Sequence, residues 1–107
     1  MEQKISFKNE LWMHGGPGSG GWCFVTVPEL LSKKIRRSHS ESEEGWGRLK
    51  IRAVIGETAW ETAIWFDTKH AAYLLPVKAM VRKKEKLAIG SRVSVVIDLK
   101  GVGNRPS

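Results

Sequence analysis

The sequence has a single cysteine, Cys23, so no disulfide can form within the chain. A small secreted domain stapled by disulfides is therefore excluded, and we expect a cytoplasmic protein. Long apolar runs are also missing, and the charged residues Glu2 and Lys4 come early with no apolar block behind them. We thus expect neither a signal peptide nor a transmembrane helix, and no association with a membrane.

Potential metal ligands and catalytic groups are few and scattered. His14, His39, His70 and Cys23 form no Cys-x-x-Cys or His-x-x-x-His pairing, whereas a zinc site needs several ligands at short spacing. No paired carboxylates and no Ser-His-Asp order can be recognised either. We expect no metal, no cofactor and no catalytic residue. Cys23 lies in an apolar segment, which favours a buried side chain over a nucleophile.

The stretch HGGPGSGGW, residues 14–22, is rich in glycine and resembles a phosphate-binding loop at first sight. A P-loop ends in lysine followed by serine or threonine at the start of a helix, and a dinucleotide-binding loop also leads into a helix. Here the glycines lead into an apolar, strand-like segment. We therefore expect a connection between two strands, with closure over a ligand as the open alternative.

Basic residues outnumber acidic residues by 18 to 11, which gives a formal net charge of +7 at pH 7. A field of this sign attracts polyanions such as nucleic acid. Acidic residues gather at 41–44, directly after the first basic run, and a solvated surface with one acidic loop is the simpler explanation of the charges. The candidate polyanion surface comprises Lys33, Lys34, Arg36, Arg37, Arg48, Lys50, Arg52, Lys83 and Lys84.

Alternation of apolar and polar residues predicts six strands. The clearest covers 48–55, where every second residue from Leu49 to Ile55 is apolar. After a turn at 56–57, residues 58–66 continue the alternation, so the two segments predict a hairpin. The other expected strands are 4–14, 22–27, 72–75 and 92–99.

Two prolines stand where short helices can begin. Pro28 precedes Leu31 and Ile35, which are spaced for one helix face, and we expect this helix to end near Arg37. Pro76 is expected to begin a second helix. The apolar residues at helical spacing in the second helix are Val77, Met80, Val81 and Leu87.

A weak repeat connects these elements, since the order strand, proline, basic helix, strand occurs twice. Pro28 and Pro76 are 48 positions apart, and Arg48 and Arg92, which begin the strands after the helices, are 44 apart. Each unit leaves an apolar face uncovered, and two such units facing each other close a small barrel. The sequence predicts a mainly β, single-domain fold over 1–100 with two pseudo-repeated halves and a flexible tail at 101–107.

Five segments occur in an order that resembles a known family. They are WCFVTVP (22–28), GWGRLKI (45–51), WET (60–62), YLLPVK (73–78) with Arg82 after it, and IG (89–90). Over about residues 3–100 the chain is similar to a prokaryotic family of small domains of unknown function. The resemblance implies a double-split β-barrel of about six strands with two short proline-initiated helices, in the fold group of the AbrB- and MazE-like regulators. Some relatives carry the domain beside a bacteriocin-protection segment of the YdeI/OmpD-associated type.

This resemblance implies a fold and no reaction. Two residues depart from the expected pattern: Ser91 follows Gly90 in place of aspartate, and Ala63 follows the WET motif in place of serine. If relatives use those side chains in chemistry, this chain lacks that chemistry.

Large aromatic side chains are frequent for the length of the chain, with five tryptophans. Trp60 lies on the apolar face of its strand and fits the core. Trp12 and Trp65 have the opposite parity, so they either stack on a base or a partner, or are buried by a second layer. Arg82 either anchors an anion, caps carbonyl groups or pairs with a nearby glutamate. The candidate ligand cleft comprises Trp12, Trp60, Trp65, Tyr73 and Arg82.

Three functions remain open from the sequence. The first is a non-enzymatic binding or regulatory module that contacts nucleic acid or another polyanion. The second is a small-molecule-binding protein or an enzyme, with a pocket near the glycine-rich loop, Trp60, Tyr73 and Arg82. The third is a protein-interaction domain, as a monomer or a weak homodimer, that uses Trp12 and Trp65. The lack of a catalytic signature favours the first.

Overall fold

The computed structural model describes residues 4–15, 22–39 and 47–99. The glycine-rich stretch, except for its ends, and the acidic residues at 41–44 lie outside the described residues. The same is true of the tail expected at 101–107.

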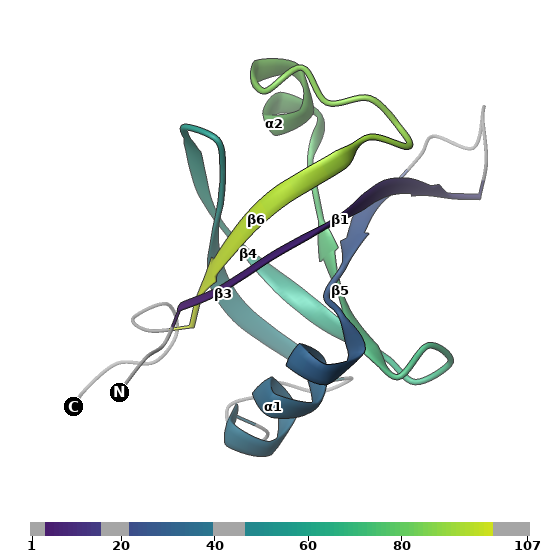
Figure 1. Ribbon diagram of the computed structural model, residues 1–107, viewed down its shortest axis with the longest axis vertical. Coiled ribbons are helices and arrows are strands. Elements are labelled where there is room, and N and C mark those ends of the chain that lie inside the picture. The colour runs from purple at the N-terminus through teal and green to yellow at the C-terminus, as the bar shows by residue number, and fades with distance from the viewer. Residues whose placement is uncertain (1–3, 16–21, 40–46, 100–107) are drawn as a thin grey trace.

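Six strands and two helices make up the described part of the chain (Figure 1). The strands close a barrel in the order β1-β2-β5-β4-β3-β6, and all neighbouring strands are antiparallel. The expected fold class is confirmed. The elements are β1 (Lys4–His14), β2 (Trp22–Thr26), α1 (Glu29–His39), β3 (Arg48–Ile55), β4 (Thr58–Asp67), β5 (Ala72–Pro76), α2 (Ala79–Lys84) and β6 (Arg92–Asp98).

The predicted alternation produces the core. In β3, Leu49 and Ile51 are buried while Lys50 between them is exposed, and in β6 the inward residues Val93 and Val95 are buried. Inward side chains of a six-strand barrel fill its interior, and in the closed barrel each of the six strands pairs with two neighbours. Burial of this apolar surface is the main force that stabilises the fold.

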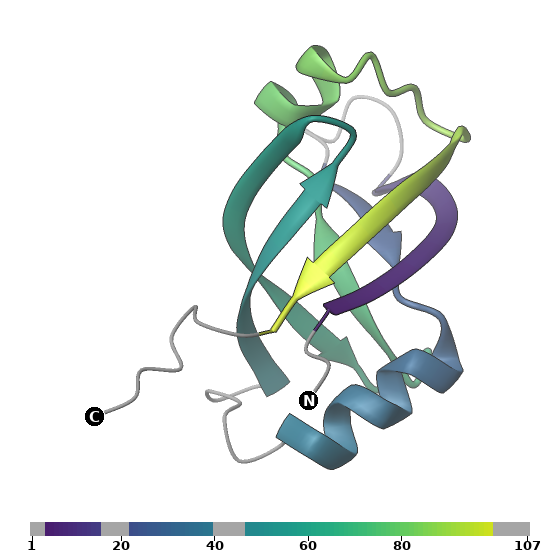
Figure 2. The same cartoon turned by 60° about the vertical axis from the view of Figure 1, so that its left-hand side comes forward.

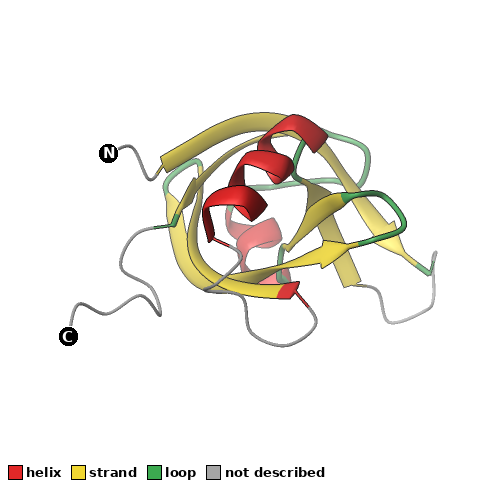
Figure 3. Cartoon of the chain, turned by 90° about the horizontal axis from the view of Figure 1, so that it is seen from below, coloured by secondary structure: helices red, strands yellow, loops and turns green. Residues whose placement is uncertain are grey.

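The two helices lie at opposite ends of the barrel, as Figures 1 and 2 show. From below, α1 lies across one opening of the ring of strands (Figure 3). Ser32 connects this helix to the barrel, since its fully buried hydroxyl donates to the Val27 carbonyl at 3.1 Å and accepts from the Tyr73 N–H at 3.0 Å. One side chain thereby satisfies two buried backbone groups.

The barrel has an internal two-fold relation. Exchanging β1 with β4, β2 with β5, and β3 with β6 leaves the strand order unchanged. The Val27 N–H donates to the Tyr73 carbonyl and the Val77 N–H to the Cys23 carbonyl, both at 2.9 Å. Each of these bonds becomes the other when 27 is exchanged with 77 and 23 with 73. The pseudo-repeat is therefore real, with a spacing of 50 positions around β2 and β5.

This spacing corrects the prediction for the second helix. Pro28 stands directly before α1, but Pro76 is the last residue of β5, where it pairs with Phe24. The prediction that Pro76 begins a helix is wrong, because α2 begins at Ala79, 50 positions after Glu29. Alignment on the prolines shifts the repeat by two residues, and the structural counterpart of Pro28 is Lys78.

Candidate functional site

The five residues of the predicted cleft do not come together. Trp60 and Arg82 line one hollow, Trp12 lines another, and Trp65 lies 53% exposed on the outside of the barrel. Tyr73 is fully buried, with its ring edge-on to Phe66. The prediction of a single cleft is therefore wrong, and Tyr73 belongs to the core.

Trp12 and Trp65 each lie on the face of their strand opposite to its apolar residues, but their surroundings differ. The Trp12 indole Nε1–H donates to the Thr26 hydroxyl at 2.9 Å, and its ring lies 5.2 Å from that of Phe24. These contacts hold Trp12 half-buried in a hollow of about 410 Å³, which also includes Asn9 and His70. Of the two, only Trp65 offers an open indole surface.

Trp65 lies next to basic residues on the outer face of β3 and β4. Across the ladder, Trp65 pairs with Arg48 on one side and with the half-buried Leu74 of β5 on the other. Lys50, two residues along β3, pairs with Ala63. Directly paired residues project on the same side of a sheet at close range. We call the surface formed by Trp65, Arg48, Lys50 and Leu74 the Trp65 face.

Arg52 continues the basic stripe of β3 into a different environment. It pairs with Glu61 on β4 and with Asp98 on β6, and Asp98 pairs in turn with Lys4 on β1. Charges therefore alternate across four neighbouring strands, an arrangement that favours sheet pairing. Because acidic residues lie on both sides of Arg52, we expect Arg52 to contribute less than Arg48 or Lys50 to the binding of a polyanion.

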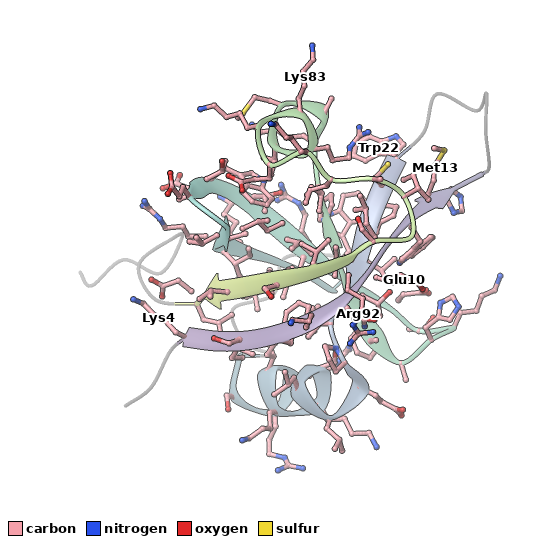
Figure 4. All side chains as sticks on the ribbon, turned by 45° about the horizontal axis from the view of Figure 1, so that its top comes forward. Lys4, Glu10, Met13, Trp22, Lys83 and Arg92 are labelled. Carbon is pink, nitrogen blue, oxygen red and sulfur yellow. The ribbon has the colours of Figure 1, made fainter. Side chains whose placement is uncertain are left out.

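The remaining basic residues of the predicted polyanion surface lie at the two ends of the barrel. Lys83 and Lys84 are on α2, and Figure 4 shows Lys83 at the end away from α1. On α1, the Arg36 guanidinium carbon lies 3.9 Å from the centre of the Phe66 ring, which brings this helix beside the end of β4 that carries Trp65. The predicted surface is thus split, with Lys33, Lys34, Arg36 and Arg37 on α1 and Arg48 and Lys50 at the Trp65 face.

A second candidate site lies where β2, β4 and β5 approach α2. It is a hollow of about 340 Å³, within the range of small-molecule pockets, and we call it the Arg82 hollow. Trp60, only 7% exposed, and the 64%-exposed Trp22 both line it. The lining residues are Trp22, Cys23, Trp60, Glu61, Thr62, Pro76, Val77, Lys78, Ala79 and Arg82.

Comparison with known domain families covers most of this barrel. Residues 7–97 match a domain described as a domain of unknown function, DUF1905. The chain belongs to the DUF1905 family. The matched region runs from within β1 to within β6, so it includes the described residues of both candidate sites. Comparison with curated proteins gives no match.

Two residues of the Arg82 hollow in this DUF1905 domain, Trp22 and Lys78, were not among the predicted cleft residues. In the sequence, Trp22 comes directly after the glycine-rich stretch and Lys78 comes two residues after Pro76. Neither residue belongs to a sequence pattern that predicts a binding site. If the two halves are aligned with a spacing of 50 positions, Lys78 is equivalent to Pro28. This alignment shows Lys78 as a position at which the two halves differ. Sequence reasoning missed this signal because it aligned the prolines.

Metal ligands do not gather in the part of the DUF1905 domain that the structure describes. Among residues 4–15, 22–39 and 47–99, no three His, Cys, Asp or Glu side chains are placed to hold an ion. Cys23 is a free, buried thiol in β2. In the same residues, neither α1 nor α2 has the length and apolar content that a membrane-spanning helix needs.

Asp67 of the DUF1905 domain, at the end of β4, has a carboxyl group with a shifted pKa. Its carboxylate accepts hydrogen bonds from the His70 ring and from the Lys69 N–H, the latter at 3.1 Å. The His70 contact is the largest cause, and it lowers the pKa of Asp67 below the ordinary value of 3.8. The folded state therefore favours the ionised carboxylate.

This contact predicts a pH-dependent contribution to stability. A lowered pKa stabilises the fold at pH values above 3.8, and the contribution is lost as the pH falls through the lowered pKa. We expect the unfolding free energy of Asp67→Asn to lie below that of the wild type near neutral pH, and the difference to shrink as the pH falls below 3.8 and through the lowered pKa. Urea denaturation at a series of pH values measures this. A difference that is constant over the range would contradict the assignment.

Proposed function

We propose that this DUF1905 domain is a non-enzymatic binding module that takes single-stranded nucleic acid on the Trp65 face. The observation that carries the proposal is the pairing of a half-exposed tryptophan with Arg48 across the β3–β4 ladder, with Lys50 two residues away on the same face. β-Barrels that bind single strands combine exposed aromatic rings with a basic groove in this way. The net charge of +7 supports the same class of partner.

The chemistry of the Trp65 face suits a strand with unpaired bases. A base stacks on the open indole of Trp65, and Leu74 extends the apolar surface beside it. Phosphates then meet Arg48 and Lys50, whose partners across the ladder are Trp65 and Ala63. Stacking tolerates any base, so the proposal predicts affinity with little sequence preference.

The test is titration of a labelled single-stranded oligothymidylate, followed by fluorescence anisotropy at several salt concentrations. Loss of one stacked base costs about 1–3 kcal/mol, so we expect Trp65→Ala to weaken binding about fivefold or more. The double variant Arg48→Ala/Lys50→Ala removes two phosphate contacts, and the slope of log K against log salt then falls in magnitude by about 1.4.

Arg52→Ala is the matched control, since Arg52 lies on the same strand and face but pairs with Glu61 and Asp98. We expect it to weaken binding much less than removal of Arg48 and Lys50. No binding of the oligonucleotide at low salt, or equal binding by wild type and a folded Trp65→Ala variant, would refute the proposal. Specific capture of a protein partner through Trp65 instead would support an interaction domain.

The finer family grouping is part of the same proposal. AbrB- and MazE-like regulators, whose fold the sequence resembles, build their barrel from two chains, whereas this chain closes the barrel alone. The proposal therefore rests on the sheet face of a single chain and needs no two-fold DNA-reading surface. A cytoplasmic location agrees with a nucleic-acid partner.

A further inference from the structure

The internal two-fold relation of the barrel provides a comparison between its two halves. The Arg82 hollow and the hollow that contains Trp12 lie at equivalent places, each beside the start of a helix. With the spacing of 50 positions, the equivalent pairs are Val27 and Val77, Pro28 and Lys78, Glu29 and Ala79, Ser32 and Arg82, and Ala72 and Trp22.

Ser32 and Arg82 share one structural contact, which they make with different side chains. The Ser32 hydroxyl donates to the Val27 carbonyl at 3.1 Å, and the Arg82 Nε–H donates to the equivalent Val77 carbonyl at 3.1 Å. A fully buried serine does this in the first half without any charge. A neutral donor is therefore enough for this carbonyl contact at the equivalent position, and the contact does not need the charge of Arg82.

Most of the other differences between the two hollows also favour an anion, and the acid Glu61 in the lining of the Arg82 hollow opposes it. Going from the hollow that contains Trp12 to the Arg82 hollow, Pro28 becomes Lys78 and Glu29 becomes Ala79, so one cation is gained and one acid is lost. Ala72 becomes Trp22, which adds an indole ring. Together with Arg82, these changes make the second hollow positive and aromatic, while the barrel around it is preserved.

The geometry of Arg82 leaves its outer nitrogens for a ligand. Because Nε is used by Val77, the planar guanidinium is held in a fixed orientation, and its two Nη groups form the fork that binds carboxylate or phosphate. Within the described residues, neither Arg82 nor Lys78 forms an ion pair. Glu85, the acid nearest to Arg82 in sequence, instead accepts from the Thr58 hydroxyl at 2.6 Å and from the Glu57 N–H at 3.3 Å.

Aromatic surface lies beside these cations. Trp22 is 64% exposed and is supported from one side by Phe24, with nearly parallel rings 6.4 Å apart. In Figure 4, Trp22 lies at the end of β2 beside α2, the helix that carries Arg82. The nearly buried Trp60 contributes a second indole to the lining. A flat ring bound here contacts tryptophan while its charged group meets Arg82 and Lys78.

We propose that the Arg82 hollow binds a small aromatic anion, a planar ring that carries one carboxylate or one phosphate group. The volume of about 340 Å³ matches a ligand of this size. Glu61, on the rim of the same hollow, accepts a hydrogen bond from an N–H of the ring and repels a ligand with many negative charges. This site is separate from the Trp65 face and takes a different class of ligand.

Isothermal titration with two matched pairs of probes tests the proposal. Indole-3-acetate and its neutral amide test an aromatic carboxylate, and adenosine 5′-monophosphate and adenosine test an aromatic phosphate. We expect one anion to bind with a Kd of about 1 mM or lower and at least about tenfold more tightly than its neutral partner. The pair that shows the difference identifies the anionic group. Failure of both anions to bind, or equal binding of the neutral compounds, overturns the proposal.

Variants locate the binding. Arg82→Gln keeps a donor for the Val77 carbonyl and removes the charged fork, so we expect affinity to fall about tenfold or more. The matched control is Arg37→Gln, an exposed arginine on α1 at the other end of the barrel, with no expected change.

Should Arg82→Gln fail to fold, Lys78→Ala and Trp22→Ala, both at exposed positions, decide the question. Wild-type affinity in all folded variants of the hollow contradicts the proposal. Wild-type affinity in Trp65→Ala supports a site separate from the Trp65 face.

Discussion

Replacement of Tyr73 by alanine is expected to lower the free energy of unfolding by about 3–5 kcal/mol, the usual cost of removing a large aromatic ring from a core. The side chain is fully buried and packs edge-on against Phe66, with ring centres 5.2 Å apart. Domains of this size are stable by only about 5–15 kcal/mol in total, so the variant will lose a large share of its stability. Urea denaturation followed by circular dichroism measures the loss.

Tyr73→Phe is the control for this prediction, because it keeps the ring and removes only the hydroxyl. We expect it to cost much less than Tyr73→Ala, because the ring and its packing against Phe66 stay in place. The comparison distinguishes a core residue from the ligand-binding residue that the sequence suggested. If Tyr73→Ala lost less than about 1 kcal/mol, the placement of the ring in the core would be wrong.

Replacement of Ser32 by alanine is the second large effect, with an expected loss of about 2–4 kcal/mol. The Ser32 hydroxyl satisfies the Val27 carbonyl and the Tyr73 N–H at once, in a position with no solvent exposure. Each buried backbone group left without a partner costs about 1–3 kcal/mol, and alanine leaves two of them. The same denaturation experiment measures the loss.

Ser94→Ala is the matched control for Ser32→Ala, since Ser94 is an exposed serine on β6. Exposed substitutions of this kind usually change stability by less than about 0.5 kcal/mol. Equal losses in the two variants would show that the Ser32 hydroxyl does not connect α1 to the barrel.

The candidate sites were predictable only in part. The sequence singled out Trp65, Arg48 and Lys50, because their parity placed them opposite the apolar faces of their strands. It could not tell that Trp12, with the same parity, is held half-buried by Thr26 and Phe24. Parity states which side of a strand a residue faces, whereas coverage of that side depends on neighbouring strands and helices.

The Arg82 hollow shows the same limit more sharply. Arg82 could be named from its motif, and of its three suggested roles the structure shows the carbonyl contact, to Val77. Its neighbours in the hollow come from β2, β4 and β5, which no local pattern connects. Trp22 and Lys78 are 56 positions apart in the chain and come together because β2 pairs with β5.

The sequence by itself determined where the strands lie and which of their residues fill the barrel. The alternation of apolar and polar residues is a local property of the sequence, and a closed sheet must bury the face that carries the apolar residues. The bounds of β3 and β6 could therefore be predicted to within a residue. The tertiary structure decided the register between β2 and β5, where Val25 pairs with Leu75. That pairing joins residues 50 positions apart, and it sets which halves are equivalent, where α2 begins and which cations meet Trp22. Long-range register depends on how two whole faces pack together, and a local reading of the chain does not contain this information.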